Sequence, residues 1–398
     1  MTIGRRLIVL LGVSFILISI NGTIFWTIFR VFIYAIGGSF VEVALVSALQ
    51  NLFSIFLSPF WGALSDEIGK RKPFIVFGSA SIAIFTPFFV LAKNVSEYLI
   101  IFAFASIFNS MVYPNINAYI TEIVESEYRG KTLGYFFGFN AIGWTLGGLL
   151  SGVIAETLGM NYVFIFAGII GITGSIFTHI FIEEKELNIA EKKAAIRKAW
   201  KRVIRTIHIE RNPDLNILLI VIMLFGAGSG IFFTIFQVKF FESVGRSYVV
   251  YGIVSALSGI GSIIAPPAYG YLTDKISKKI VFQATLLSYA AYFVVLGIIW
   301  DPVILAILWF LPLWPGVRIS SIAIAADISE EGTIGEYQGF VDSSSAVSRT
   351  IGAIFGGIIA DLFNARTNLY IIDYILVAAS IGPLLGAIIL NKLKIRKI

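Results

Sequence analysis

Two stretches of this chain read alike: GALSDEIGKRKPF at Gly62–Phe74 and GYLTDKISKKIVF at Gly270–Phe282, 208 residues further on. Shorter matches keep the same order at nearly the same offset, among them EYRG at Glu127–Gly130 and EYQG at Glu336–Gly339. A repeat of half the chain is far longer than the period of a solenoid. It therefore indicates two copies of one structural unit.

The composition is that of a protein that crosses a membrane many times. Hydrophobic residues make up 57% and charged residues 14% of the 398 residues, whereas about 25% of the residues in a soluble domain are charged. The mean hydropathy is +0.88, and the apolar stretches reach the about 20 residues that a helix needs to cross a bilayer. Because these stretches are continuously apolar and do not alternate, a β-barrel is excluded. We predict an all-α membrane protein with twelve spans, at 7–36, 41–65, 73–92, 98–120, 132–156, 162–182, 215–241, 248–272, 280–299, 303–325, 338–360 and 369–391.

The spans divide equally between the two copies of the repeat. Each copy of six spans enters and leaves on the same side, so we expect two six-helix bundles related by a pseudo-twofold axis along the membrane normal. The predicted domains are an N-terminal bundle at 1–183, a cytoplasmic linker at 184–213 and a C-terminal bundle at 214–398. The apolar positions of the linker share one helical face, which predicts an amphipathic helix on the membrane surface. A partly ordered tether is the alternative.

Lysine and arginine determine the predicted orientation. They gather at both termini, in the linker and in the loops after the second, fourth and eighth spans, whereas the other side holds only Lys93, Arg246 and Arg366. Because cytoplasmic loops carry the excess of Lys and Arg, both termini are predicted to lie in the cytoplasm, with the spans in the cytoplasmic membrane. The net charge of +6 follows from this bias and does not indicate a nucleic-acid partner.

Each residue type in the repeated loop after the second span has a physical role. Gly62 removes a side chain where a neighbouring helix approaches closely. Asp66 can place its carboxylate at the N-terminus of a helix, where free N–H groups favour an anion. Lys70 and Arg71 can anchor the loop to the anionic inner leaflet. An anchor alone would explain the basic residues, but not the glycine and the aspartate, both of which recur in the second copy.

This loop resembles the signature loop of the major facilitator superfamily, G-x-L-[ST]-D-x-x-G-[RK]-[RK]-[RK]. Gly270, Asp274 and Lys278–Lys279 form its degenerate copy after the eighth span. The resemblance implies the major facilitator fold and a secondary transporter that works by alternating access, not an enzyme, with no cofactor. It also implies a monomer whose partners are a small-molecule solute, protons and membrane lipids.

A second element follows the fourth span, where Glu122 precedes Arg129-Gly130 by seven residues. It resembles the corresponding cytoplasmic element of the sugar porters. The resemblance implies a salt-bridge network of Asp66, Glu122 and Arg129 that closes the cytoplasmic side. In the second half Asp327 is spaced differently and Gln338 replaces the arginine, so we expect a weaker second latch.

Polar side chains near the middle of the spans predict where a solute binds. In such a fold the solute lies near the midplane, at the interface of the two halves. Amides with tryptophans suit a neutral hydroxylated solute, and the loop also resembles that of cation-coupled glycoside symporters, so we favour a sugar. The alternative is that half of these amides only tie helices together. The predicted pocket residues are Asn21, Gln50, Asn51, Asn117, Asn140, Trp144, Arg318, Ser345 and Arg349, with Asn115, Ser344, Trp26 and Trp314 as further candidates.

Charged residues inside spans are candidate functional residues, because each costs about 2.5–3.5 kcal/mol at a helix centre. Arg318 and Arg349 lie near mid-depth in the tenth and eleventh spans, and either could pair with Asp342. Arg318 could instead bind an anionic solute, which would make the protein an organic-anion carrier. Asp342 is also the predicted proton site, ahead of Asp373 and Glu242.

Several chemistries are excluded by what the sequence lacks. The chain has no cysteine and two histidines without nearby ligands, so zinc and haem sites are not expected. The sequence at Gly130–Thr132 resembles the end of a phosphate-binding loop but lacks its upstream glycine. A drug or metabolite exporter remains an alternative, although the glycines of the fifth span, which predict close helix packing, are not followed by the proline that drug antiporters carry. A membrane sensor or a lipid flippase on the same scaffold is the alternative outside solute transport.

Overall fold

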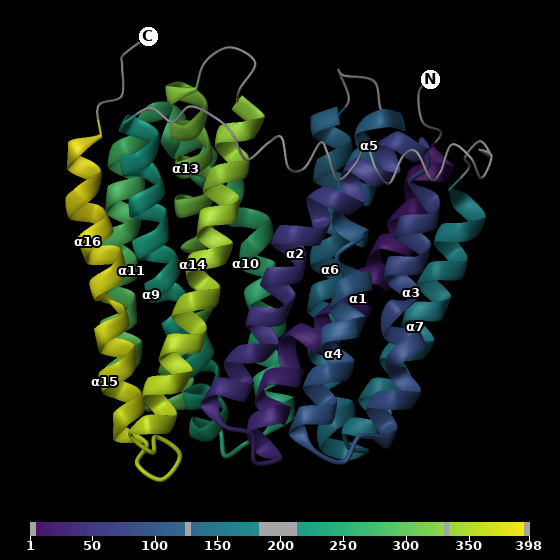
Figure 1. Ribbon diagram of the computed structural model, residues 1–398, viewed down its shortest axis with the longest axis horizontal. Helices are drawn as coiled ribbons and strands as arrows, with labels where there is room; N and C mark the ends of the chain where they lie inside the picture. Colours follow the sequence, from purple (N-terminus) through teal and green to yellow (C-terminus); the bar gives the residue numbers. More distant parts are fainter. Residues whose placement is uncertain (1–4, 124–128, 183–212, 330–333, 394–398) are drawn as a thin grey trace. The chain divides into compact units, whose positions relative to one another are not determined.

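The computed structural model describes residues 5–123, 129–182, 213–329 and 334–393. Over these residues every regular element is a helix (Figure 1). They form 12 helical spans that are long and apolar enough to cross a membrane, and three of these spans are each made of consecutive shorter helices. The prediction of twelve helical spans is therefore confirmed. The helices of the first half are α1 (Arg5–Ala35), α2 (Phe40–Ile68), α3 (Lys72–Leu91), α4 (Val95–Asn109), α5 (Val112–Ile123), α6 (Arg129–Thr157) and α7 (Met160–Phe181). Those of the second half are α9 (Pro213–Ser243), α10 (Tyr248–Lys275), α11 (Lys278–Ile298), α12 (Pro302–Trp309), α13 (Trp314–Ile328), α14 (Ile334–Leu362), α15 (Tyr370–Ala379), α16 (Ile381–Ile389) and the short η2 (Leu390–Lys392).

The chain forms two compact units, and each is discontinuous in sequence. Unit 1 holds Met1–Phe32, Phe53–His208 and Tyr248–Gly259, and unit 2 holds Ile33–Leu52, Ile209–Ser247 and Ile260–Ile398. The first part of α2 thus belongs to unit 2, and the first part of α10 to unit 1. The predicted linker lies outside the described residues, and the domain boundaries at 183 and 214 stay a prediction.

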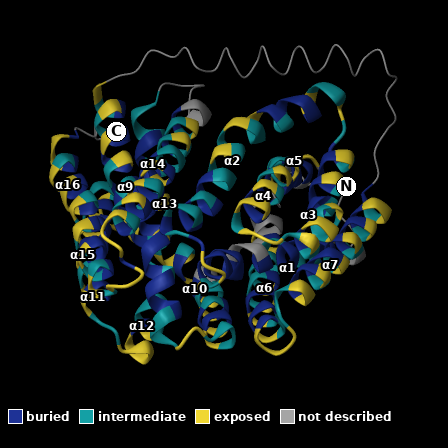
Figure 2. Ribbon diagram, turned by 60° about the horizontal axis from the view of Figure 1, so that its bottom comes forward, coloured by how far each residue is buried: buried dark blue, intermediate teal, exposed yellow. Residues whose placement is uncertain are grey.

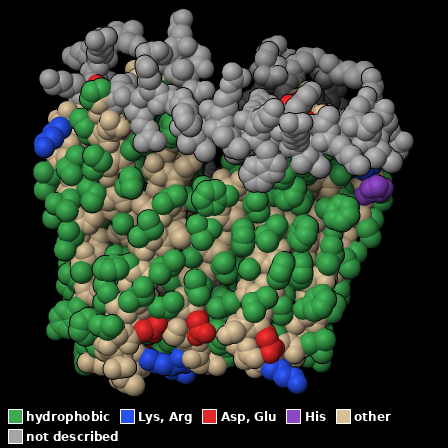
Figure 3. Space-filling model, viewed as in Figure 1, with side chains coloured by type: hydrophobic (Ala, Val, Ile, Leu, Met, Phe, Trp, Pro, Cys, Tyr) green, Lys and Arg blue, Asp and Glu red, His purple; other side chains and the backbone are tan. Residues whose placement is uncertain are grey.

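Hydrophobic side chains cover the middle of the visible face, whereas acidic and basic side chains gather at its lower edge (Figure 3). Many large apolar residues on the spans are exposed, including Phe56, Ile100, Ile180, Ile298 and Leu384. Such a surface would aggregate in water but matches the hydrocarbon core of a bilayer. The chain is therefore a multi-pass membrane protein.

The core of unit 1 is aromatic. Phe29 of α1 stacks on Phe102 of α4 with ring centroids 4.9 Å apart, and Phe89 of α3 stacks on Phe164 of α7 at 5.1 Å. Offset or tilted rings of this kind add to the energy of apolar burial. This cluster holds four spans of the first half together.

The core of unit 2 is built around α9, which carries a long run of buried residues and packs against α14, α15 and α16. In Figure 2 exposed residues appear on peripheral helices such as α16. Phe232 of α9 stacks on Phe293 of α11 at 3.9 Å. Close packing of α14 on α9 requires glycine, because a Cβ at Gly352 would lie 2.1 Å from the carbonyl oxygen of Ala227. Close packing through small residues, which the sequence predicts for the fifth span, is thus also found in the eleventh.

The first part of α2 is held in unit 2 by the end of α14 and the residues that follow it. Asp361 accepts hydrogen bonds from the backbone N–H groups of Phe40 and Val41, at 2.8 and 2.9 Å. Arg366 donates to the carbonyl oxygens of Tyr34 and Gly38, at 2.8 and 2.9 Å. These two side chains satisfy backbone groups at the N-terminus of α2 and the C-terminus of α1, which a helix cannot satisfy internally.

Unit 1 contains the related contact at the start of α10. The carboxylate of Glu156, at the end of α6, accepts a hydrogen bond from the backbone N–H of Val249 at 3.1 Å. A Cβ at Gly152 would lie 2.5 Å from the carbonyl oxygen of Tyr248, so α6 and α10 approach closely beside this bond. The repeat in the sequence thus extends to how each of these two helices is capped.

Candidate functional site

The spacing of the first loop brings three charged side chains of unit 1 together. Arg71 donates to Glu122 at 2.6 Å and also bonds to Asp66 and to the hydroxyl of Ser65. Burial would lower the pKa of Arg71, but the hydrogen bonds to Glu122 and Asp66 outweigh it and raise the pKa. The guanidinium therefore stays charged and joins the two carboxylates. The side chain of Arg129, the expected cation of this network, lies outside the described residues.

The second loop forms a smaller cluster. Lys278 donates to both carboxylate oxygens of Asp327, at 2.7 and 2.8 Å. Asp274 is exposed, and no hydrogen bond of its carboxylate is found among the described residues. Lys279, which aligns with Arg71, instead donates to the carbonyl oxygens of Asn391 and Leu393. That the second latch is weaker stays a prediction, and one ion pair in place of two supports it.

In the first repeated loop the backbone conformation requires a glycine at Gly69, and not at Gly62 as expected. A Cβ at Gly62 would meet only Pro114 at 3.9 Å, an ordinary contact, and a Cβ at Gly270 would meet nothing within 4 Å. The close helix approach predicted at these two positions is absent from the described structure. Gly69 instead has φ of 67°, a left-handed conformation that favours glycine. The second loop has Ser277 at the aligned position, with φ of −70°, and its ion pair is made by the lysine that follows.

In unit 1 two of the predicted pocket amides tie helices together. Asn21 is buried and donates to the carbonyl oxygen of Ser79 at 3.4 Å, which joins α1 to α3. Asn140 donates to the hydroxyl of Ser19 at 2.8 Å, which joins α6 to α1. These bonds favour the structural alternative for both amides.

A polar group on α5 and α6 remains as the solute-facing candidate of unit 1. Asn117 is exposed and Trp144 is half-buried. The hydroxyl of Tyr113 interacts with the side chains of Asn140 and Trp144. The sequence prediction missed Tyr113, because a tyrosine in an apolar span reads as a core residue. Gln50 and Asn51 are half-buried on α2, and the side chain of Trp26 lies outside the described residues.

In unit 2 the charged residues of the tenth and eleventh spans meet. Arg318 of α13 donates to Asp342 of α14 from both terminal guanidinium nitrogens, with Nη2 at 3.1 Å from Oδ2. Arg349 donates its Nε–H to the carbonyl oxygen of Ser345 at 3.2 Å and interacts repulsively with Arg318. Among the described residues no carboxylate pairs with Arg349. The partner of Asp342 is thus Arg318, and not the arginine on its own helix.

The other two candidates for the proton site have close partners in unit 2. Asp373 accepts from the buried Lys239 at 2.7 Å and from the indole of Trp300 at 2.9 Å. Glu242 accepts from the hydroxyl of Tyr34 at 2.7 Å and from Arg246 at 2.8 Å. The pKa of Arg246 is raised, because it donates to Glu242. Each of these carboxylates therefore forms an ion pair with a neighbouring cation.

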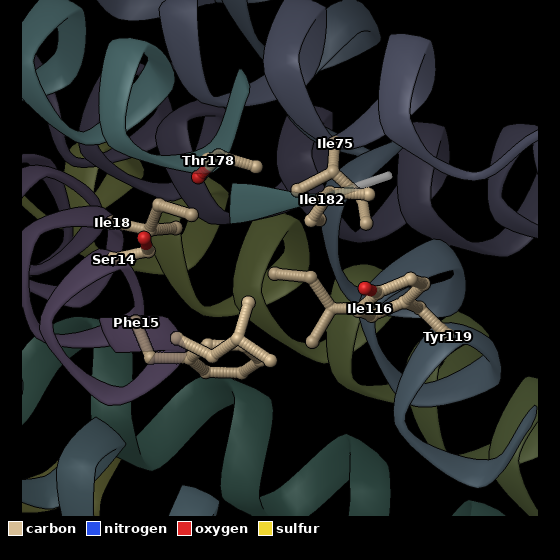
Figure 4. A pocket seen from close by; sticks show the side chains of 9 residues that line it. Ser14, Phe15, Ile18, Ile75, Ile116, Tyr119, Thr178 and Ile182 are labelled. Atoms are coloured by element: carbon tan, nitrogen blue, oxygen red, sulfur yellow. The ribbon is translucent and has the colours of Figure 1, made fainter. Parts of the chain in front are cut away.

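Unit 1 also contains a small apolar cavity, lined by isoleucines that include Ile18, Ile75, Ile116 and Ile182 (Figure 4). Its volume is about 10 Å³, about the space of one water molecule. Ser14 and Thr178 at its edge donate to carbonyl oxygens of their own helices. This cavity is too small for a solute.

Twelve apolar helices with ion pairs inside the spans and a charged cluster at each repeated loop define a membrane transport protein. Residues 11–241 and 218–394 match the family model of the Major Facilitator Superfamily, and the chain belongs to this superfamily. The resemblance of the loop motif is thereby confirmed, as is the major facilitator fold.

Two curated relatives share the name "Multidrug resistance protein MdtG". The protein from Rahnella sp. (strain Y9602) is 25% identical over 337 residues, which cover 82% of this chain and 79% of the relative. The protein from Dickeya zeae (strain Ech586) is 27% identical over 270 residues, 67% of this chain and 64% of the relative. Among solved structures, the nucleoside transporter NupG superposes with a TM-score of 0.79 at 12% identity, over 99% of this chain and 100% of that chain. At this identity the match shows the fold alone.

Proposed function

We propose that this protein is a secondary transporter that exports small organic molecules, and that Asp342 carries the proton to which transport is coupled. The observation that supports the coupling is the ion pair of Arg318 and Asp342. Their side chains are 48% and 45% exposed, whereas the ion pairs of Arg71 and Lys239 bury the cation almost completely. A carboxylate that is open to solvent or solute and has one exchangeable partner can change its protonation state.

The solute class follows from the relatives and from the amides. The relatives' names describe drug resistance, which fits the exporter that the sequence left as an alternative. The sugar prediction rested on a set of amides with tryptophans and on the resemblance of the loop to glycoside symporters, and two of those amides, Asn21 and Asn140, are engaged between helices. The proposed solutes are therefore amphipathic organic molecules, with Tyr113, Asn117 and Trp144 of unit 1 as candidate contacts. Both termini are proposed to be cytoplasmic and the protein to act as a monomer.

The test is transport by the purified full chain in liposomes under an imposed pH gradient. A panel of lipophilic cations, organic anions and sugars is offered, and proton movement is followed with a pH-sensitive dye. We expect solute-dependent proton flux for organic ions, and Asp342→Asn should abolish the flux while solute exchange without a gradient persists. The matched control is Asp301→Asn, which changes a carboxylate that caps α12 locally. Transport of sugars alone, or full coupling in Asp342→Asn, would contradict the proposal.

A further inference from the structure

We propose that Arg349 and Arg318 form the binding site for a carboxylate, phosphonate or phosphate group on the transported solute, and that Asp342 is the resident anion that the solute displaces from Arg318. This inference rests on the proposed transport function and adds the charge of the solute. The site lies within unit 2, on α13 and α14, which pack against each other.

The charges of this site do not balance. Two guanidinium groups face one carboxylate, and the single ion pair joins Arg318 to Asp342. Arg349 has the carbonyl oxygen of Ser345 as a partner, which offsets only part of the cost of a cation inside a span. A solute that brings a negative charge would remove this imbalance.

The neighbouring helices offer Arg349 no other counterion among the described residues. On α9 and α15, Lys239 pairs with Asp373. On α13, Asp327 pairs with Lys278. Tyr289 of α11 interacts with Arg349, and Tyr269 of α10 interacts with Tyr289. Both tyrosines are neutral near pH 7. Glu242 of α9 pairs with Arg246.

The geometry suits an organic anion with a flat apolar part. The planar fork of an arginine matches the two oxygens of a carboxylate or phosphate group. Asp342, Ser345 and Arg349 are spaced so that they share one face of α14. Trp314 is 46% exposed and lies four residues before Arg318, one turn away on the same face of α13. An aromatic surface therefore stands beside the cationic group.

Anion binding at this site depends on the ionisation of Asp342. The ionised carboxylate competes with the solute for Arg318 and repels it, and protonation removes both effects. Affinity for the anion should therefore rise as the pH falls, so the proton and the anion cross the membrane together, and export is driven by the solute's own outward gradient. Tyr289 and Tyr269 do not titrate between pH 5 and pH 8, because the tyrosine pKa is ordinarily about 10, and the two histidines, His179 and His208, are outside these elements.

The experiment measures binding of three matched probes to the purified full chain in neutral-lipid nanodiscs, at pH 6 and pH 8. The probes are 2-naphthoate, 2-naphthalenemethanol and 2-naphthylmethylammonium. We expect 2-naphthoate to bind at least tenfold more tightly than the alcohol and more tightly at pH 6. Arg349→Gln should lose about tenfold, and Arg349→Lys, which keeps the charge, should lose less. Asp342→Asn should bind 2-naphthoate more tightly than the unmodified protein at both pH values, because its amide neither repels the anion nor carries the charge that holds Arg318. The control Lys93→Gln, an exposed lysine far along the chain from this site, should change nothing.

The outcomes separate this inference from the proposed function. Tighter binding of the ammonium probe, no binding of 2-naphthoate, or equal binding by Arg349→Gln would overturn the anion site. If lipophilic cations are transported with protons in liposomes while 2-naphthoate does not bind, transport stands and the anion site fails. If no organic ion is transported, the proposed function fails, whatever the binding result.

Discussion

The contact of Asp361 with the start of α2 can be tested by a single atom exchange. Asp361→Asn keeps one oxygen acceptor for the N–H groups of Phe40 and Val41 but removes the negative charge from the N-terminus of α2. Hydrogen bonds to a charged group are worth about 1.5–3 kcal/mol, and a charge at a helix end about 0.3–1 kcal/mol. We expect a loss of about 1–2 kcal/mol, a factor of about 5–30 in the population with this contact open.

The assay uses the absence of cysteine from the chain. Ser39→Cys places one thiol in the turn before α2, and the rate of labelling by a membrane-impermeant maleimide reports how often this turn opens. Asp361→Asn should raise the rate about 5- to 30-fold. Asp301→Asn, which alters a cap made to Val303 and Ile304 at 2.9 Å, is the matched control and should leave the rate unchanged. Equal rates in all three proteins would refute the reasoning.

Three further changes test other contacts by the thermal stability of the purified protein. Gly352→Ala places a methyl group against the carbonyl oxygen of Ala227 and should destabilise the folded protein by about 1–3 kcal/mol. The control Gly138→Ala, whose added methyl group would have nothing within 4 Å, should be neutral or stabilising. Equal melting temperatures of the two variants would contradict this prediction. Arg71→Lys replaces the forked guanidinium with a single ammonium group, which can hold only one of Asp66 and Glu122, so the melting temperature should fall. Adding Glu122→Gln to Arg71→Lys should lower the melting temperature by less than the sum of the two single changes. Lys239→Met leaves Asp373 without its cation and should cost about 3–5 kcal/mol, and the double change with Asp373→Asn should recover part of it; no recovery would show that packing, not charge, decides.

The architecture could be predicted because the apolar runs and the internal repeat can both be identified directly in the amino-acid sequence. Twelve continuous apolar runs leave the helix as the element that satisfies the backbone in lipid, and the matching loops near Gly62 and Gly270 divide the spans into two sets. The sequence did not predict where a helix is interrupted within a span. One span contains α4 and α5, with a break at Ser110, and another contains α12 and α13, with a break at Pro312.

The partners of individual charges could not be predicted in the same way. Asp342 and Arg349 share a helical face, yet Asp342 pairs with Arg318 from a neighbouring helix, since the rotation of packed helices is not encoded in spacing. The role of Arg71 was also misjudged in part: a basic residue in a loop suggests a lipid anchor, whereas its burial between Asp66 and Glu122 depends on Gly69 turning the chain back.

The way in which α1 and α2 are completed has a consequence for biosynthesis. The carbonyl oxygens of Tyr34 and Gly38 and the N–H groups of Phe40 and Val41 are bonded by Asp361 and Arg366, more than 300 residues later in the chain. The ribosome therefore delivers the first hairpin long before the side chains that satisfy it, and water must hydrate these groups in the meantime. The earliest part of the protein to enter the membrane is among the last to reach its final structure, and a nascent chain that stops before residue 361 leaves it unfinished.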